Sequence, residues 1–179
     1  MGSIRSPELV NLICVVFGSD LQYKLRDILE ILESKVDKVD FVSKPLDFSK
    51  FTSYYEAEMG NPLESRIVSF ESLIHPSELA DMKVLTNSIE MDLAIDGKRK
   101  FNIDAGYIHH SQFVLASTKQ WGSRIYLKNG IYAEITLLYL NGKFRSWEMT
   151  YPNYKTEEYI EELEKIRELY MQKKRKSHK

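Results

Sequence analysis

The chain contains little sulfur and no long apolar segment. Cys14 is the single cysteine among 179 residues, which excludes an internal disulfide and a cysteine cluster for zinc. The N-terminus lacks the apolar core of a secretory signal, and no apolar run approaches the length of a bilayer-spanning helix. We therefore expect no membrane partner and a cytoplasmic location.

An excess of charge of either sign is also missing. Lysine and arginine together number 25 against 26 aspartates and glutamates, which gives a formal net charge of -1. This balance provides no general attraction to nucleic acid or to an anionic membrane. The basic run at 173–179 is expected to be a flexible, solubilising tail after a single domain that spans residues 1–172.

Motifs that would specify a cofactor are absent. No G-x-G-x-x-G is present to bind a dinucleotide, and no G-x-x-x-x-G-K-[ST] provides a phosphate loop. His109 and His110 are adjacent, and adjacent side chains point in different directions in regular secondary structure, so the pair alone does not predict a metal site. The sequence therefore specifies neither a cofactor nor a metal.

The patterns that are present alternate between strand and helix. A β-branched apolar run at 9–17 predicts a central strand, and the apolar spacing at 21–36 predicts an amphipathic helix. The further expected elements are strands at 40–48, bent at Pro45, and at 66–74, and helices at 76–94 and from about 156. Two β-α-β units predict an α+β fold with a ferredoxin-like βαββαβ core, an antiparallel sheet, an extra β-hairpin and a C-terminal helix.

Polar side chains are densest between residues 101 and 139. Lys128-Asn129-Gly130 separates two β-rich runs there and predicts a tight hairpin turn, because an Asn-Gly pair favours positive φ angles. Side chains alternate along each strand of such a hairpin. The residues expected to share one face are Arg124, Tyr126, Tyr132 and Glu134.

Two further segments contain candidate site residues. The predicted helix at 76–94 carries Lys83, Asn87 and Glu90 at i, i+4 and i+7, which places them on one face. Asp104-Ala105-Gly106 is expected to form a turn, since glycine adopts backbone conformations closed to other residues.

Several motifs together resemble one bacterial and archaeal family, domain of unknown function 4416. They are YYEAEMG (54–60), SFE (69–71), LADMK (79–83), TNSIE (86–90), NIDAGY (102–107), LASTK (115–119), RIYL (124–127), GIYAE (130–134) and TYPNY (150–154). Some members of that family are labelled GTP-binding, but this chain has neither a phosphate loop nor an N-K-x-D motif. The chain departs from the usual family pattern at Ala105, His109 and His110, and the resemblance implies no established activity.

The leading functional hypothesis is a polar pocket for a small anionic or phosphorylated ligand. Convergent cations would hold the anion, and a carboxylate could act as general base or bind a metal ion through oxygen. The candidate catalytic residues are Glu134, as first choice, and Asp104. The candidate ligand-binding residues are Arg66, Lys83, Asn87, Glu90, Asn102, Tyr107, Lys119, Arg124, Tyr126 and Tyr132.

Two alternatives remain open from the sequence. The chain could be a noncatalytic interaction module that presents Tyr54, Tyr55 and Tyr151 to a protein partner, since tyrosine is favoured at interface hot spots. It could also be an RNA-associated factor that stacks bases on sheet aromatics, although the net charge and the lack of an aromatic-rich RNA motif count against a nucleic-acid partner.

Overall fold

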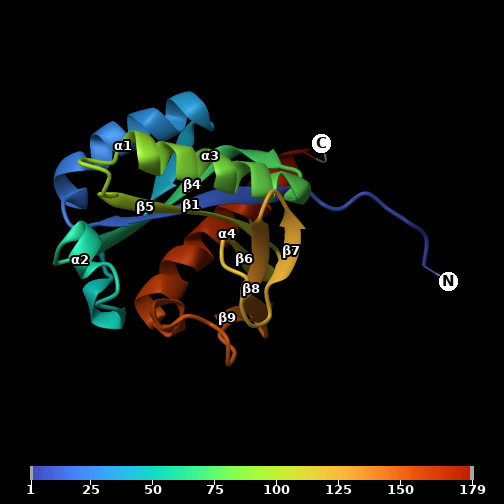
Figure 1. Cartoon of the computed structure of the whole chain (residues 1–179). Coiled ribbons are helices and arrows are strands. Elements are labelled where there is room, and N and C mark those ends of the chain that lie inside the picture. The colour runs from blue at the N-terminus through green and yellow to red at the C-terminus, as the bar shows by residue number, and fades with distance from the viewer. Residues whose placement is uncertain (1, 178–179) are drawn as a thin grey trace.

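The computed structural model describes residues 2–177, which form a mixed α/β architecture with a nine-stranded antiparallel sheet and four α-helices (Figure 1). The strands are β1 Val10–Gly18, β2 Val39–Val42, β3 Leu46–Asp47, β4 Glu64–Ile74, β5 Phe101–His109, β6 Gln112–Ser117, β7 Ile125–Lys128, β8 Ile131–Leu140 and β9 Lys143–Arg145. The helices are α1 Leu21–Lys35, α2 Glu56–Met59, α3 Leu79–Asp92 and α4 Glu157–Ser177, with short 3-10 turns at Ser49–Phe51, Pro76–Glu78 and Pro152–Lys155.

The sheet has the order β2-β4-β1-β5-β6-β8-β7, with β3 beside β4 and β9 beside β8. β1 lies in the interior, as its apolar run predicts, and all nine of its residues are buried. Side-chain alternation along β1 separates two cores. Cys14 and Val16 pack with α1 and α3 on one face, while Ile13 and Val15 pack with α4 on the other, and Figure 1 shows these helices on opposite sides of the sheet.

The hairpin predicted from Asn129-Gly130 is confirmed. Asn129 has a φ of 55° and Gly130 a φ of 75°, which are the positive angles that the tight turn requires. The turn sets the register of β7 against β8, with Lys128 opposite Ile131.

The expected turn at 104–106 is wrong, because these residues lie inside β5. Gly106 pairs with Ile13 on β1 and with Leu115 on β6. A Cβ at Gly106 would lie 2.6 Å from the carbonyl oxygen of Val114, so the glycine permits close strand approach. A glycine in a sequence can indicate either a turn or a tightly packed strand. At Gly106, the pairing with β1 and β6 decides for the strand.

The basic run expected as a flexible tail is helical as far as the structure describes it. α4 continues to Ser177, and residues 178–179 lie outside the described part. Lys173 anchors this end of the helix, because its ammonium lies 2.6 Å from Asp40 Oδ2 and donates a hydrogen bond to the carbonyl oxygen of Phe70. Among residues 2–177, no helix is both long enough and apolar enough to cross a membrane.

Candidate functional site

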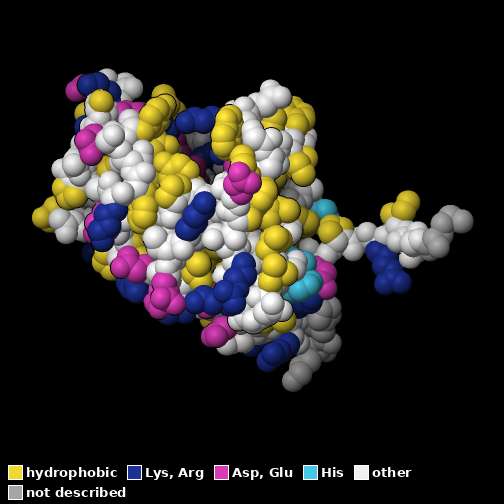
Figure 2. Space-filling model, turned by 90° about the horizontal axis from the view of Figure 1, so that it is seen from below, with side chains coloured by type: hydrophobic (Ala, Val, Ile, Leu, Met, Phe, Trp, Pro, Cys, Tyr) yellow, Lys and Arg dark blue, Asp and Glu magenta, His cyan; other side chains and the backbone are white. Residues whose placement is uncertain are grey.

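A cavity of about 480 Å³ opens beside the first half of β5. Its walls come from α3, β5, β6, β8, the segments at 48–55 and 117–124, and the 3-10 turn at Pro152–Lys155. Figure 2, which views the molecule from below, shows a hollow between two lobes with basic and acidic side chains inside it.

The cavity exists because β5 and β6 diverge. β6 pairs with β5 only between Gly106 and His109, so the first five residues of β5 have no strand partner on that side. Side chains of α3 take the place of the missing strand at Ile103. Lys83 Nζ donates to the carbonyl oxygen of Ile103 at 3.0 Å, and the Ile103 N–H donates to Glu90 Oε1 at 2.8 Å.

Most of the predicted site residues line this one cavity. They are Lys83, Asn87, Glu90, Asn102, Asp104, Lys119, Arg124 and Glu134. The helix spacing predicted a common face for the residues on α3, and the sheet order brings β5, β6 and β8 next to one another. Segments as far apart as residues 83 and 134 therefore meet at one place.

Arg66 is not part of the cavity. It lies on β4, which is on the far side of β1 from β5. Its Nε pairs with Glu64 Oε1 at 2.8 Å, and its Nη1 donates to the carbonyl oxygen of Ser43 at 3.1 Å. The prediction that Arg66 shares a pocket with the other cations is therefore wrong.

Three predicted tyrosines also lie outside the cavity lining. Tyr126 and Tyr132 face each other across the β7–β8 hairpin, with ring centroids 5.3 Å apart. Tyr107 lies three residues beyond Asp104 and packs beside the Leu79 and Ala80 cluster under α3. The hairpin prediction placed Tyr126 and Tyr132 on the correct face, but that face extends past the edge of the cavity.

A charged network joins α3 to the cavity wall. Lys83 is only 4% exposed, and its Nζ lies 2.8 Å from Asp104 Oδ1 and 3.6 Å from Glu90 Oε1. Burial alone would lower the pKa of Lys83, but the charges of Asp104 and Glu90 outweigh burial and raise that pKa. Lys83 therefore stays charged at neutral pH and is occupied by its partners.

Arg99 extends the network and was not predicted from the sequence. Its guanidinium makes two parallel hydrogen bonds to Glu58, at 2.8 and 3.0 Å, and its Nη1 lies 3.0 Å from Glu90 Oε2. These bonds raise the pKa of Arg99 and lower that of Glu58. Arg99 occurs in a basic turn of the sequence, where nothing distinguishes it from solvent-facing lysines.

Arg124 and Glu134 form the opposite wall. Arg124 Nε donates to Glu134 Oε2 at 2.6 Å, which places the two side chains together as the hairpin pattern predicted. Arg124 Nη1 also donates to Ser117 Oγ at 2.8 Å and to the carbonyl oxygen of Lys119 at 3.1 Å. The guanidinium thus fixes the end of β6 against the hairpin.

The mouth of the cavity combines a lysine with aromatic rings. Lys119 Nζ lies 4.9 Å from the centroid of the Tyr54 ring, and the Tyr54 and Tyr55 rings meet edge to face at 4.9 Å. Burial raises the pKa of Tyr55 to about 12, so its hydroxyl remains protonated at neutral pH. The structure places Tyr54, Tyr55 and Tyr151, the tyrosines of the protein-interaction hypothesis, in the cavity lining.

Two buried amides in the lining have unpaired groups. Asn102 accepts a hydrogen bond from Arg99 on Oδ1, and its Nδ2 has no partner among residues 2–177. Asn153, at 0% exposure, has neither its Nδ2 nor its Oδ1 paired. The hydroxyls of Tyr154 and Tyr159 approach the Asn153 amide, although neither completes a hydrogen bond of good geometry. Asn153 was missed as a site residue, although it lies within the TYPNY motif.

The lining limits the chemistry that the cavity offers. It contains neither histidine nor cysteine, so acid–base chemistry falls to carboxylates, Lys83 and tyrosines. Within residues 2–177, the cavity carboxylates do not form a group of three ligand atoms close enough to share a metal ion.

Comparison with known proteins gives one relationship. No curated protein and no solved structure matches the chain. A family model described as Domain of unknown function (DUF4416) matches residues 8–170, which include every residue of the cavity. Because the match covers nearly the whole chain, the protein belongs to the DUF4416 family.

Proposed function

We propose that the cavity binds a small anionic or phosphorylated ligand. The observation that carries this proposal is the imbalance of its unpaired hydrogen-bonding groups. Asn102 Nδ2 and Asn153 Nδ2 are donors without acceptors, and Asn153 Oδ1 is the single unpaired buried acceptor among the side chains of residues 2–177. A buried donor left unpaired is costly, so a ligand rich in acceptor oxygens would satisfy this lining.

The acidic groups of the cavity do not act as acceptors for the unpaired amide donors, because other donors already pair with them. Asp104 and Glu90 already receive hydrogen bonds from Lys83, Arg99 or the backbone, and Glu134 receives one from Arg124. Their charges are therefore balanced by cations fixed in place. A ligand anion would meet charged donors rather than bare carboxylates.

Lys119 is a cation outside the charged network. Within residues 2–177, its ammonium has no carboxylate partner, and it lies against the Tyr54 ring at the cavity mouth. Arg124 Nη2 likewise makes no hydrogen bond to the described residues, whereas Nε and Nη1 are engaged. These groups would form charge-assisted hydrogen bonds with a phosphate or carboxylate.

The walls and size suit a ligand that also has an apolar or planar part. A volume of about 480 Å³ is within the range of small-molecule sites. Phe17, Phe48, Tyr54 and Tyr55 form one aromatic side, with Phe17 and Phe48 stacked at 4.3 Å. Phe17 and Phe48 are buried, so the exposed Tyr54 ring would stack on a flat ligand while the donors bind the acidic group.

Native mass spectrometry of protein purified under mild conditions tests this directly, because a retained metabolite would appear as added mass. Thermal-shift titrations with inorganic phosphate, pyrophosphate, adenosine monophosphate and adenosine then separate the anion from the ring. We expect the charged probes to raise the Tm and Lys119→Met to weaken their binding about 10-fold, whereas adenosine should give a smaller shift.

The matched control is Lys24→Met, which removes a lysine from an exposed pair with Asp27 on α1. This variant should bind the probes as the unaltered protein does. Equal binding by the Lys119→Met and Lys24→Met variants, with no retained metabolite, would refute the proposed site.

A second candidate is a protein-interaction surface on the edge strand β7. Ile125 is 67% exposed and Tyr126 57% exposed, beside Trp121 at 63%. β7 ends the sheet, so one side of its backbone has no strand neighbour among the described residues. Size-exclusion chromatography with light scattering tests it, and Ile125→Lys should abolish any self-association that the unaltered chain shows.

We also infer a ferredoxin-like core within the larger sheet. The elements β1, α1, β2, β4, α3 and β5 follow one another as two β-α-β units. The sheet order β2-β4-β1-β5 and the placement of α1 and α3 on one face support this assignment. Comparison of an experimental structure with ferredoxin-like domains tests it.

A cytoplasmic location is a further part of the proposal. Cys14 is free and buried, which is compatible with a reducing compartment. Cell fractionation followed by immunodetection checks the assignment, and recovery in the membrane pellet would contradict it.

A further inference from the structure

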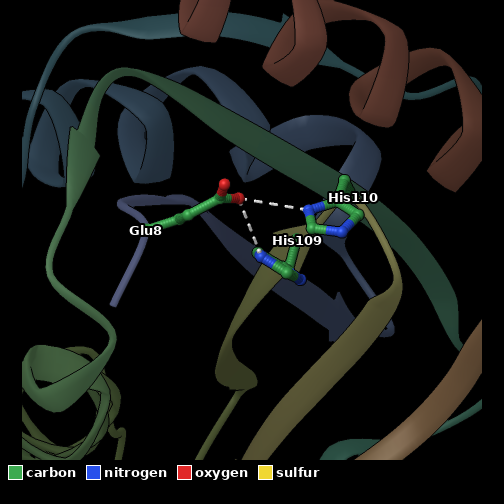
Figure 3. Close-up of side chains that lie close together, drawn as sticks. All are labelled: Glu8, His109 and His110. Atoms are coloured by element: carbon green, nitrogen blue, oxygen red, sulfur yellow. Dashed lines mark hydrogen bonds and ion pairs between the residues drawn. The ribbon is translucent and has the colours of Figure 1, made fainter. Parts of the chain in front are cut away.

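A second polar cluster lies away from the cavity, at the turn between β5 and β6 (Figure 3). It contains Glu8, from the segment before β1, His109, the last residue of β5, and His110 in the turn. Glu8 Oε2 lies 3.2 Å from His109 Nε2 and 3.1 Å from His110 Nδ1. Their potential ligand atoms all lie within 4.8 Å of one another.

We propose that Glu8, His109 and His110 bind a first-row transition-metal ion of the Zn²⁺ class. Zinc lies about 2.0–2.2 Å from imidazole nitrogen and carboxylate oxygen, so neighbouring ligands of a tetrahedral site are roughly 3.3–3.5 Å apart. The two Glu8 distances, 3.1 and 3.2 Å, are near that edge length. Two imidazoles with one carboxylate suit zinc, nickel or copper rather than calcium or magnesium.

The convergence of the two histidines comes from the turn. Adjacent side chains diverge along a regular strand, but β5 ends at His109 and His110 lies in a tight turn before Gln112. Their ring centroids are 3.9 Å apart, and Figure 3 shows both rings directed toward the Glu8 carboxylate. Glu8 supplies the third ligand that the adjacent pair lacks in the sequence.

Neighbouring groups fix the orientation of His109, and the site remains open to solvent. His109 Nδ1 lies 2.9 Å from Ser111 Oγ, and a hydrogen bond there orients the ring with Nε2 toward Glu8. The Glu8 and His110 side chains are each 45% exposed, so an ion can enter from solution. Three protein ligands at an open site leave a fourth position for water.

Lys174 is the group that a metal ion would compete with. Its Nζ lies 2.5 Å from Glu8 Oε2, so α4 presents a positive charge to the same oxygen. Arg167, also on α4, donates from Nε to the carbonyl oxygen of His110 at 2.9 Å, so it contacts the backbone of His110. A divalent ion on the two imidazoles would replace the Lys174 ammonium as the partner of Glu8.

The bound ion would connect the segment before β1 to the β5–β6 turn. Glu8 lies 101 positions from His109 in the chain, and both lie beside α4, Glu8 at Lys174 and His109 at Tyr170. A ligand that binds the folded state but not the unfolded chain stabilises the fold in proportion to its concentration. Zinc binding should therefore raise the Tm as well as fill the site.

The test uses the full chain without an affinity tag, stripped with chelator and titrated with Zn²⁺ by calorimetry. Co²⁺ absorption in the visible range reports coordination geometry in the same protein. We expect one saturable site, and at least about a 10-fold loss of affinity in His110→Ala and Glu8→Gln. His75→Ala is the matched control, because His75 caps a 3-10 turn elsewhere and should leave the affinity unchanged.

Lys174→Met gives the result that separates a metal site from a simple ion-pair cluster. Removing the competing ammonium should strengthen Zn²⁺ binding by several-fold, whereas an ion-pair cluster without a metal site would show no Zn²⁺ binding in either protein. Circular dichroism confirms that each variant is folded. The proposal is overturned if folded His110→Ala binds Zn²⁺ as tightly as the unaltered chain.

Discussion

Glu90 accepts a hydrogen bond from the backbone N–H of Ile103 at 2.8 Å, in the position where a neighbouring strand would accept it. Lys83 provides the matching donor of that absent strand, because its ammonium donates to the carbonyl oxygen of the same residue. Two side chains of α3 thereby satisfy an edge of β5 that β6 does not cover. The backbone of Ile103 is thus paired although the sheet opens beside β5, and the cavity occupies that opening.

Replacing Lys83 by methionine should strongly destabilise the fold. The change keeps an unbranched apolar side chain but leaves Asp104 and Glu90 without their buried cation. Breaking a buried pair by removing one partner costs about 3–5 kcal/mol. Urea unfolding should show a loss of that order, whereas Lys24→Met, from an exposed pair, should lose less than about 1 kcal/mol. Equal losses in the two variants would contradict the structural role of Lys83.

Replacing Asn102 by aspartate should weaken binding of anionic probes with little change of shape. The new carboxylate still accepts from Arg99, but the unpaired Nδ2 donor becomes a negatively charged acceptor. We expect adenosine monophosphate to bind about 10- to 100-fold more weakly, a cost of about 1.4–2.8 kcal/mol. Asn141→Asp adds the same charge in an exposed turn and should leave calorimetric affinity unchanged.

Replacing Glu134 by glutamine should release the charge of Arg124. Glutamine can still accept a hydrogen bond from Arg124 Nε, but it no longer neutralises the guanidinium. Affinity for inorganic phosphate should then rise about 3- to 10-fold by calorimetry, because phosphate gains an unopposed cation. Glu30→Gln, in the exposed pair with Arg26, is the control. Weaker phosphate binding by the Glu134→Gln variant would argue against an anion at this wall.

The same variant tests the catalytic role predicted for Glu134. If a metabolite retained by the protein proves to be a substrate, loss of a general base should reduce its turnover by about 100-fold or more. Unchanged turnover in Glu134→Gln would show that Glu134 is not the general base. The general base would then be Asp104, the second candidate, or a group other than a carboxylate.

Cys14 should make the protein sensitive to alkaline pH. Burial raises the pKa of its thiol from 9.0 to about 12 in the folded state, while the unfolded chain ionises near 9.0. The thiol therefore contributes full stability below pH 9, and that contribution falls as pH rises from 9 toward 12. The slope of unfolding free energy should include about 1.4 kcal/mol per pH unit from this group.

Urea unfolding of Cys14→Ala between pH 8 and 10.5 isolates that contribution. The variant should lose some stability at every pH because it leaves a small cavity, but its slope above pH 9 should be shallower. Val16→Ala is the matched control, since it truncates another buried side chain on β1 without removing a titratable group. Parallel slopes in all three proteins would exclude Cys14 as a source of the pH dependence.

Local sequence patterns were sufficient for much of the architecture and part of the site. The apolar run of β1, the helical spacing of α1 and α3, and Asn129-Gly130 depend on neighbouring residues, so their structures follow from local physics. The common face of Lys83, Asn87 and Glu90 followed from helical geometry for the same reason. Arg99, Asn153 and the exclusion of Arg66 could not be predicted, because each depends on which distant segments become neighbours.

By itself, the sequence determined that the chain alternates strands with amphipathic helices and that polar groups gather after residue 101. Only the tertiary structure decided that Gly106 lies within a strand, that β6 separates from β5, and that Glu8 meets His109 and His110. Hydrogen-bond spacing and side-chain periodicity act over a few residues. Sheet order and the convergence of distant side chains depend on long-range packing, which residue patterns constrain only weakly.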